Sequence, residues 1–121
     1  MKISETPEQW VVLKLKSGLD DDTVYKVFAG WRGGYLDGDR WKLNSGITKV
    51  EEDDDYFYFY GYSGSCYKCH KNGYGVKEGM YRFSSYVQGV LENIIEKGRL
   101  LGNDICVEIM NDETDWKELK I

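Results

Sequence analysis

The stretch of sequence from residue 53 to residue 64 reads Asp53-Asp54-Asp55-Tyr56-Phe57-Tyr58-Phe59-Tyr60-Gly61-Tyr62-Ser63-Gly64. Successive side chains of an extended strand point to opposite faces, so the four tyrosines share one face and the two phenylalanines share the other. A phenylalanine favours the dry side of a sheet, whereas the hydroxyl of a tyrosine needs a polar partner. The stretch therefore predicts a strand with Phe57 and Phe59 in the core and a tyrosine face that is at least partly exposed.

Further strands are predicted on both sides of this one. β-Branched and aromatic runs bounded by turn residues occur at residues 10–16, 23–31, 35–36, 40–43, 47–52, 65–70 and 105–110. In the first run, Val11, Leu13 and Leu15 share one face. The pair Asp37-Gly38 and the triplet at residues 44–46 (NSG) are typical of tight turns between antiparallel neighbours. The middle of the chain thus reads as a run of hairpins, preceded by a loose polar lead-in at residues 1–9.

The hydrophobic period changes after residue 85. Apolar side chains recur at helical spacing from there on, at Val87, Val90, Leu91, Ile94 and Ile95. Ser85 and Gln88 fit a capping box, Gly98 is a natural stop, and Gly89 in between would allow a close approach to a strand. These signals predict one amphipathic helix of about 12 residues.

Together these elements predict an α+β fold in a single domain spanning residues 1–121. We expect an antiparallel β-meander of about six to seven strands that is strongly curled. One helix at about residues 85–97 packs on one of its faces, and a final strand follows at about residues 104–110. The tail carries Trp116 in either a short helical turn or an edge strand.

Composition and charge exclude several classes of function. The net charge of −5 disfavours bulk nucleic acid and anionic membranes as partners. No apolar run approaches the roughly 20 residues of a membrane span, and residues 1–9 lack the apolar core of a signal peptide. We therefore expect a cytoplasmic protein. Its acidic clusters at predicted turns leave two readings open: solvated loops, or an acidic surface that docks a basic partner.

One formal motif is present, because residues 66–70 read CYKCH. The spacing resembles the haem-attachment signature of c-type cytochromes, which implies thioethers at Cys66 and Cys69 and a proximal ligand at His70. However, residues three apart in a strand face opposite ways, so Cys66 and Cys69 are not expected to reach one haem.

Zinc is the second chemistry open to cysteine and histidine. The candidate ligands are Cys66, Cys69, His70 and Cys106. The same strand geometry opposes a shared metal ion, and Cys106 stands alone inside another predicted strand. We therefore expect no metal and no cofactor, with the cysteines acting as small hydrophobic residues.

The length of the loop after the aromatic strand decides which residues join the tyrosine face. A two-residue loop at residues 63–64 would add Tyr67 and Cys69 to it. A three-residue loop would add Lys68 and His70 instead and make a better polar binding surface. The sequence leaves both registers open.

Binding has more support in the sequence than catalysis. The single histidine, His70, is the only ordinary candidate for a general base, and no Ser or Cys nucleophile sits in a recognisable setting. We therefore expect a non-enzymatic binding protein. Tyrosine and tryptophan dominate binding hot spots, so the tyrosine face is the predicted surface. The candidate partner- or ligand-binding residues are Tyr56, Tyr58, Tyr60, Tyr62, Tyr67, Trp31, Trp41 and Arg32.

The expected partner of this surface is another protein. A nucleotide or other small ligand stacked on the same rings is the alternative, with its phosphates near Arg32, Arg40, Lys68 or Lys71. A third reading remains open, in which the tyrosines pack beneath the helix or the tail and bind nothing.

Residues 41–47 (WKLNSGI) through 63–67 (SGSCY), in a short, acidic and aromatic-rich chain, are similar to the small accessory proteins of tailed bacteriophages. That resemblance implies stoichiometric binding to a host protein in the host cytoplasm, for host take-over or for inhibition of host defence. It implies no particular functional residue.

Overall fold

The computed structural model describes residues 3–17, 23–31, 40–74, 81–102, 104–110 and 114–119, with the backbone alone at residues 17, 40, 41 and 81–86. The elements are β1 (Gln9–Ser17), β2 (Thr23–Trp31), β3 (Arg40–Leu43), β4 (Ile47–Glu52), β5 (Tyr56–Gly61), β6 (Cys66–His70), the 3₁₀ turn η1 (Lys71–Gly73), α1 (Tyr81–Leu100), β7 (Ile105–Ile109) and the 3₁₀ turn η2 (Trp116–Glu118). The predicted strand at residues 35–36 and the Asp37-Gly38 turn lie outside the described residues.

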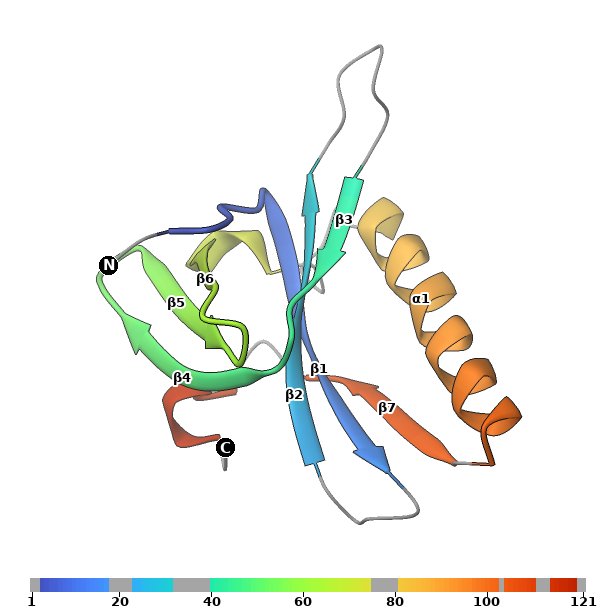
Figure 1. The fold of residues 1–121 in the computed structure, drawn as a ribbon. Coiled ribbons are helices and arrows are strands. Elements are labelled where there is room, and N and C mark those ends of the chain that lie inside the picture. Colours follow the sequence, from blue (N-terminus) through green and yellow to red (C-terminus); the bar gives the residue numbers. More distant parts are fainter. Residues whose placement is uncertain are drawn as a thin grey trace.

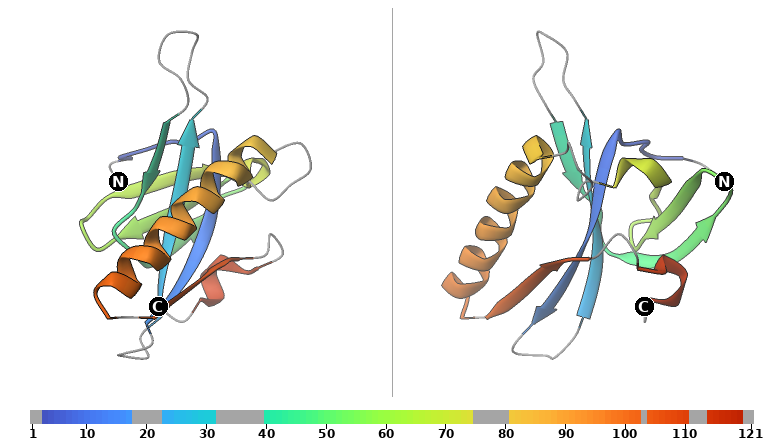
Figure 2. Two further views of the ribbon diagram at one scale, coloured as in Figure 1. Left: turned by 90° about the vertical axis from the view of Figure 1, so that its right-hand side faces the viewer. Right: turned by 180° about the vertical axis from the view of Figure 1, so that it is seen from behind.

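The strands form two antiparallel sheets. One has the order β3-β2-β1-β7 and the other the order β4-β5-β6. Helix α1 lies on one side of the four-stranded sheet, and β4, β5 and β6 lie on its other side (Figures 1 and 2). The predicted α+β class and the antiparallel pairing are confirmed. The single, strongly curled meander is wrong, because the hairpin run divides into two sheets.

The division occurs where β3 gives way to β4, at residues 44–46. The buried side chain of Asn44 accepts a hydrogen bond from the backbone N–H of Val27 through Oδ1 at 2.8 Å, and the Asn44 N–H donates to the Val27 carbonyl at 3.0 Å. Asn44 therefore continues the pairing of β2 beyond the end of β3. Gly46 follows with φ +131°, a conformation that L side chains rarely adopt, and the chain then enters the second sheet.

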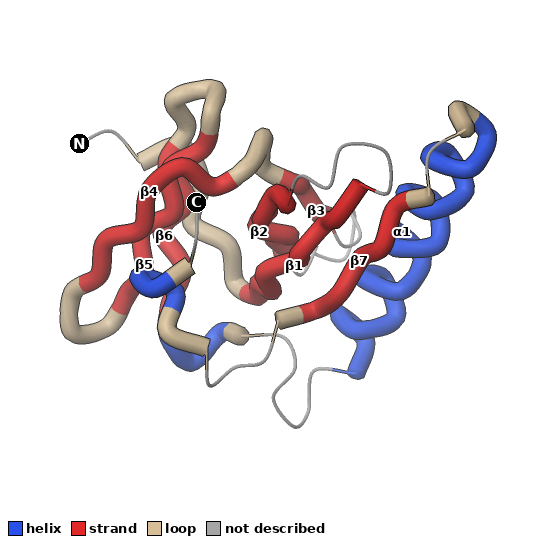
Figure 3. Tube along the Cα trace, turned by 90° about the horizontal axis from the view of Figure 1, so that it is seen from below, coloured by secondary structure: helices blue, strands red, loops and turns tan. Residues whose placement is uncertain are grey.

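Strand β1 is the centre of the molecule, as the view from below shows (Figure 3). Its residues Trp10, Val11, Val12 and Leu13 are each no more than 1% exposed. The alternation that placed Val11 and Leu13 on one face of this strand identified the face turned away from the second sheet. Trp10 contacts the rings of β5, so Trp10 and Val12 form a second core face. A sheet covered on both sides needs apolar residues at successive positions.

Trp10 is also the hub of an aromatic cluster between the two sheets. Its ring centroid lies 4.7–6.1 Å from those of four other residues, Phe57, Phe59, Tyr74 and Trp116. Its indole N–H donates to the carbonyl of His70 at 2.7 Å. Because Trp116 belongs to η2, the tail forms a short helical turn, and this turn closes the core on the phenylalanine side of β5.

Helix α1 covers the predicted apolar stripe but is longer than expected. It begins four residues before Ser85, so that residue lies within the helix and is not its cap. It continues past Gly98 and ends before Gly102, whose φ of +78° is the left-handed conformation typical of a C-terminal glycine. Val87, Val90 and Leu91 are buried as predicted, whereas Ile95 is 43% exposed. Of the described helices, α1 and the two short turns, none is long and apolar enough to cross a membrane.

The N-terminal segment is not a loose lead-in. The Ser4 N–H donates to the Cys66 carbonyl at 2.9 Å, and the Lys68 N–H donates to the Glu5 carbonyl at 2.9 Å. Glu5 and Tyr67 form a parallel bridge. The segment therefore covers the outer edge of β6, which would otherwise present unpaired backbone groups.

Substituting alanine at Gly89 and at Gly46 should change the stability of the protein in opposite directions. Gly89 is exposed, and a Cβ built there meets no atom within 4 Å, so the expected close approach to a strand is wrong. Gly89→Ala should raise the free energy of unfolding by about 0.5–1 kcal/mol, because alanine favours the helix.

Gly46→Ala should lower the free energy of unfolding by roughly 1–3 kcal/mol, because of backbone strain and a Cβ only 2.7 Å from the Tyr62 ring. Urea unfolding of both variants measures these changes; a destabilised Gly89→Ala variant would contradict the exposed position of that residue.

Candidate functional site

The aromatic strand β5 has one face in the core and one face turned outward. Phe59 is fully buried, and Phe57 is half-buried against Trp10. The tyrosine side chains are half-buried at Tyr56, Tyr58 and Tyr60 and 68% exposed at Tyr62. The predicted order of burial thus holds for Phe59 against every tyrosine, but Phe57 falls in the same half-buried range as three of them. Trp116 in the tail packs against Phe59, on the opposite face of β5, and α1 lies on the far side of the four-stranded sheet (Figure 1), so neither covers the tyrosines in the described part of the chain.

The register of β6 settles which residues join this face. The Gly61 N–H donates to the Ser65 carbonyl at 3.0 Å, so the loop has three residues, 62–64. Tyr56 is then opposite His70, and Tyr58 is opposite Lys68. On the other face, Tyr67 and Cys69 are opposite the phenylalanines and are buried. Tyr67, 2% exposed, is therefore a core residue, and its prediction as a binding residue is wrong.

Strand β4 contributes two charged residues to the same face. Lys49 is paired with Tyr60, and Glu51 is paired with Tyr58. We define the Tyr face as the outward side of β4, β5 and β6, formed by Lys49, Glu51, Tyr56, Tyr58, Tyr60, Lys68 and His70. The alternation Lys49, Glu51 within β4 was the sequence signal that could have found the two charged members.

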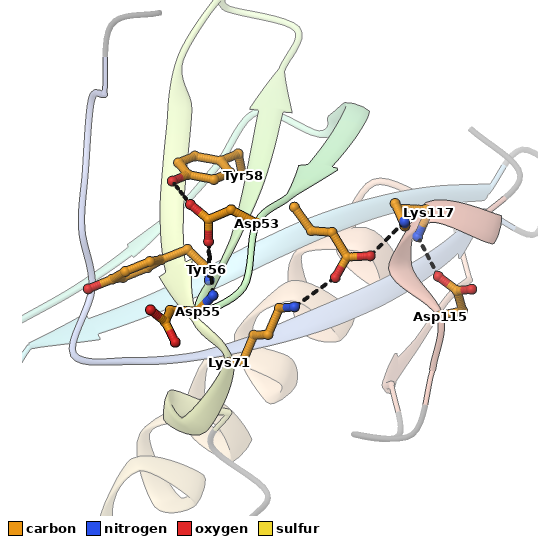
Figure 4. Close-up of polar contacts among 8 residues, drawn as sticks. Asp53, Asp55, Tyr56, Tyr58, Lys71, Asp115 and Lys117 are labelled. Atoms are coloured by element: carbon orange, nitrogen blue, oxygen red, sulfur yellow. Dashed lines mark hydrogen bonds and ion pairs between the residues drawn. The ribbon is translucent and has the colours of Figure 1, made fainter.

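Asp53, in the turn before β5, binds the Tyr58 side chain and the backbone at the start of the strand (Figure 4). One carboxylate oxygen accepts from the Tyr58 hydroxyl at 2.6 Å, and the other accepts from the backbone N–H groups of Asp55 and Tyr56 at 3.0 and 2.8 Å. These bonds, that from Tyr58 first, lower the pKa of Asp53 below its usual 3.8. The bond to Asp53 raises the pKa of Tyr58 to about 12.

In the middle of the Tyr face, Glu51 and Lys49 contact Tyr60 and each other. The Tyr60 hydroxyl donates to Glu51 at 3.3 Å, and the Lys49 ammonium lies 2.7 Å from Glu51 and 5.4 Å from the centre of the Tyr60 ring. Burial raises the pKa of Tyr60 to about 12. The pKa of Glu51 is lowered, chiefly by its bond to Lys49.

Glu52 is paired with Phe57, on the face of the sheet opposite the Tyr face, and joins β4 to two other segments. Its carboxylate oxygens lie 2.8 Å from the ammonium of Lys71 and 2.6 Å from that of Lys117 (Figure 4). These bonds, that from Lys117 first, lower the pKa of Glu52. The carboxylates of residues 51–53 are therefore committed to partners within the protein. Three of the five acids at residues 51–55 are thus paired internally, whereas Asp54 and Asp55 are exposed.

Tyr56, Lys68 and His70 form a separate group at one end of the Tyr face. The Lys68 ammonium lies 4.3 Å from the centre of the Tyr56 ring, a cation–π distance. The His70 ring meets the Tyr56 ring edge-on, with centroids 5.0 Å apart. The Nδ1 atom of His70 accepts the Asn72 N–H at 3.0 Å and caps η1.

Of the other predicted binding residues, Trp31 does not join the Tyr face. Trp31 is in β2, in the other sheet, where its indole N–H donates to the Thr6 carbonyl at 3.1 Å. Trp41 is in β3, but its side chain lies outside the described residues, as does all of Arg32. Trp31 is therefore not part of this site.

The candidate metal ligands are not brought together. Cys66 is opposite Tyr60 and Cys69 is opposite Phe57, so the two thiols lie on opposite faces of β6, as the strand geometry predicted. Cys106 is exposed in β7 of the other sheet. Within the described part of the chain, no three His, Cys, Asp or Glu side chains gather to hold a metal ion. Burial raises the pKa of both the Cys66 and the Cys69 thiol, which keeps them protonated.

Comparisons with protein-family models, with curated proteins and with solved structures found no match to this chain. The function of the protein must therefore be inferred from the geometry of the Tyr face.

The bond between Tyr58 and Asp53 can be tested by titration. In Asp53→Asn, the pKa of Tyr58 should fall from about 12 toward its ordinary value of 10, because the carboxylate that opposes its ionisation is gone. The pKa of Tyr60 should stay near 12, because burial is its main cause. NMR of ¹³Cζ-labelled tyrosine follows each residue separately. An unchanged Tyr58 would contradict the hydrogen bond.

The hydrogen bond between Asp53 and Tyr58 should also make the stability of the protein depend on pH. The folded pKa of Asp53 is below 3.8, so its stabilising effect is present above about pH 4 and is lost as the pH falls through the folded pKa. The folded pKa of Tyr58 is above 10, so its stabilising effect is present below pH 10 and is lost as the pH rises toward 12. Thermal unfolding of Asp53→Asn should therefore be less pH-dependent than that of the parent protein at both ends of the scale.

Proposed function

We propose that this protein is a non-enzymatic binding protein that docks another protein on the Tyr face. The observation that supports this proposal is an outward-facing group of tyrosines whose hydroxyls are fixed by hydrogen bonds at Tyr58 and Tyr60. Tyrosine supplies a large, rigid contact area with few rotatable bonds, and it is enriched in binding hot spots.

Preorganisation strengthens this proposal. Binding costs free energy when it immobilises side chains, at about 0.5–1.5 kcal/mol for each flexible one. On the Tyr face, Asp53 and Glu51 already hold two phenols in place, and Lys49 already holds Glu51. A partner that docks there has little further ordering to impose. The contacts of Asp53, Glu51 and Lys49 therefore fix the positions of the Tyr58 and Tyr60 side chains before a partner binds.

A nucleotide stacked on these rings is the alternative. Stacking needs an open aromatic face. The Tyr56 ring is already covered by the Lys68 ammonium at 4.3 Å, and Lys49 lies over the Tyr60 ring at 5.4 Å. A base would have to displace both cations, which favours a protein partner over a nucleotide.

The resemblance of the chain to small accessory proteins of tailed bacteriophages suggests where the partner is found. On that basis we propose a host protein in the bacterial cytoplasm as the target, bound stoichiometrically to redirect host machinery or to block a host defence. No residue of the Tyr face follows from the resemblance itself.

The proposal predicts a partner that depends on the Tyr face. Tagged protein incubated with bacterial lysate should capture a partner that Tyr56→Ala loses, with an affinity at least tenfold weaker, because hot-spot aromatics carry such losses. Quantitative mass spectrometry and then calorimetry with the purified partner measure this. Leu101→Ala is the matched control, because Leu101 is exposed and apolar but lies after α1, next to the four-stranded sheet.

Three outcomes separate the readings of this experiment. Loss of capture with Tyr56→Ala alone supports the proposed surface. Loss with Leu101→Ala instead would place binding at the end of the helix and contradict it. A thermal shift with nucleotides, abolished by Tyr56→Ala, would favour the small-ligand alternative.

A further inference from the structure

Three side chains at one end of the Tyr face have polar atoms for which the described part of the chain shows no hydrogen bond or ion pair. These side chains are Tyr56, Lys68 and His70, and we call them the donor cluster. Within the described residues, the Tyr56 hydroxyl makes no hydrogen bond, and the Lys68 ammonium makes no ion pair. Figure 4 shows the Tyr56 hydroxyl pointing away from both Asp53 and Tyr58.

The third donor is the Nε2–H group of His70, and its identity follows from the hydrogen bond that Nδ1 accepts. Nδ1 of His70 accepts a hydrogen bond from the Asn72 N–H, so Nδ1 carries a lone pair and no proton. A neutral imidazole has one N–H and one acceptor nitrogen, so the proton of His70 must be on Nε2. His70 therefore presents an N–H donor, beside the O–H of Tyr56 and the ammonium of Lys68.

The rest of the Tyr face differs from the donor cluster in charge balance. Lys49 is neutralised by Glu51 at 2.7 Å, and Asp53 is satisfied by Tyr58 and two backbone N–H groups. The donor cluster has three donors and one ammonium, that of Lys68, which makes no ion pair within the described residues but interacts electrostatically with Asp53. A partner that covers the face must supply an acceptor there, since a buried and unpaired ammonium is costly.

The backbone beneath the donor cluster is rigid. Tyr56 exchanges two hydrogen bonds with Asp53, through its N–H at 2.8 Å and its carbonyl at 3.0 Å. The Lys68 N–H is held by the Glu5 carbonyl at 2.9 Å, and the His70 carbonyl accepts from the buried Trp10 indole at 2.7 Å. Each of the three residues is thus tied to a different segment of the protein. The backbone positions from which the three donors extend are therefore set without a ligand.

We infer that the partner bound by the Tyr face presents a carboxylate to the donor cluster, so that an acidic peptide segment of the partner protein is what this end of the face recognises. The inference rests on the proposed function and specifies the chemistry of the partner. It reverses the expectation from the sequence, in which an acidic surface docked a basic partner. Glu51 and Asp53 of that surface are already paired, whereas the ammonium of Lys68 makes no ion pair within the described residues.

The surrounding charge favours a carboxylate over a phosphate. Asp54 and Asp55 are exposed at the turn next to Tyr56, and the whole chain has a net charge of −5. Attraction to Lys68 and repulsion from these groups both roughly double for a dianionic phosphate, and with two exposed carboxylates against one ammonium the repulsion grows more. A single carboxylate also matches the single positive charge of Lys68.

The test uses the intact protein and short blocked peptides. A peptide with two adjacent glutamates is titrated into ¹⁵N-labelled protein and compared with its glutamine and lysine counterparts, inorganic phosphate and adenosine monophosphate. The glutamate peptide should shift the backbone signals of Tyr56, Lys68 and His70, and the glutamine peptide should shift them far less. Lys68→Gln should weaken binding of the glutamate peptide about tenfold, as expected for the loss of one charge-assisted contact.

Lys97→Gln is the matched control, because it removes one positive charge from an exposed site in the last turn of α1. It should leave the affinity within about twofold, since surface charges at a distance are screened. Tyr56→Phe keeps the ring under Lys68 and removes only the hydroxyl donor, so it should weaken binding without changing the fold. Equal effects of Lys68→Gln and Lys97→Gln would overturn the inference, because only net charge would then matter.

Other outcomes overturn the inference while leaving the proposed function standing. Shifts on the Tyr face from the lysine peptide alone, or from phosphate alone, would show that the donor cluster does not recognise carboxylates. A captured partner that is lost with Tyr56→Ala but retained with Lys68→Gln would show the same. Failure of the proposed function has a different signature, in which neither variant changes capture.

Discussion

The burial of Trp10 between the two sheets is the constraint on which the rest of the structure depends. Its ring meets aromatic rings from β5, from the segment after η1 and from η2, and its indole N–H binds the His70 carbonyl at 2.7 Å. A buried tryptophan contributes a large apolar area, and its N–H must find a partner. One side chain therefore fixes the position of the phenylalanine face, the end of β6 and the C-terminal turn.

The Tyr face follows from that constraint. Because side chains alternate along β5, drawing Phe57 and Phe59 toward Trp10 leaves Tyr56, Tyr58 and Tyr60 on the outside. A slip of one residue would bury the phenols and expose the phenylalanines, so the core strongly selects the register. The site is thus the outer side of a strand whose inner side belongs to the core, which gives it the rigidity of the core.

The chemistry of the Tyr face is set by which of its polar groups are already satisfied. Glu51, Glu52 and Asp53 are acidic in sequence but paired in the structure, with lysines or with tyrosine hydroxyls. What remains for a partner is a group of aromatic rings with donors at one end. A count of charges along the chain predicts an acidic surface, whereas in space Glu51 and Asp53 are paired within the protein and Lys68 makes no ion pair among the described residues.

The local pattern of the sequence was enough for the α+β class, for most strands, for the presence of the helix and for the alternation of β5. These features depend on the period of apolar residues and on turn residues close in the chain. The division into two sheets was not predictable in this way, because it depends on Asn44 pairing with Val27, seventeen positions away. The ends of α1 were also missed, since Ser85 and Gly98 carry capping signals that the actual helix passes through.

The candidate site likewise has features that follow from local sequence and features that depend on tertiary contacts. By itself, the sequence determined that tyrosines and phenylalanines lie on opposite faces of β5, because that follows from the two-residue period of a strand. Only the tertiary structure decided that the loop has three residues, that Tyr67 is buried, and that Lys68 and His70 stand beside Tyr56. The reason is that a hairpin register is chosen by the whole core: with this loop, Tyr67 and Cys69 join Trp10 and Phe59 in the cluster between the sheets.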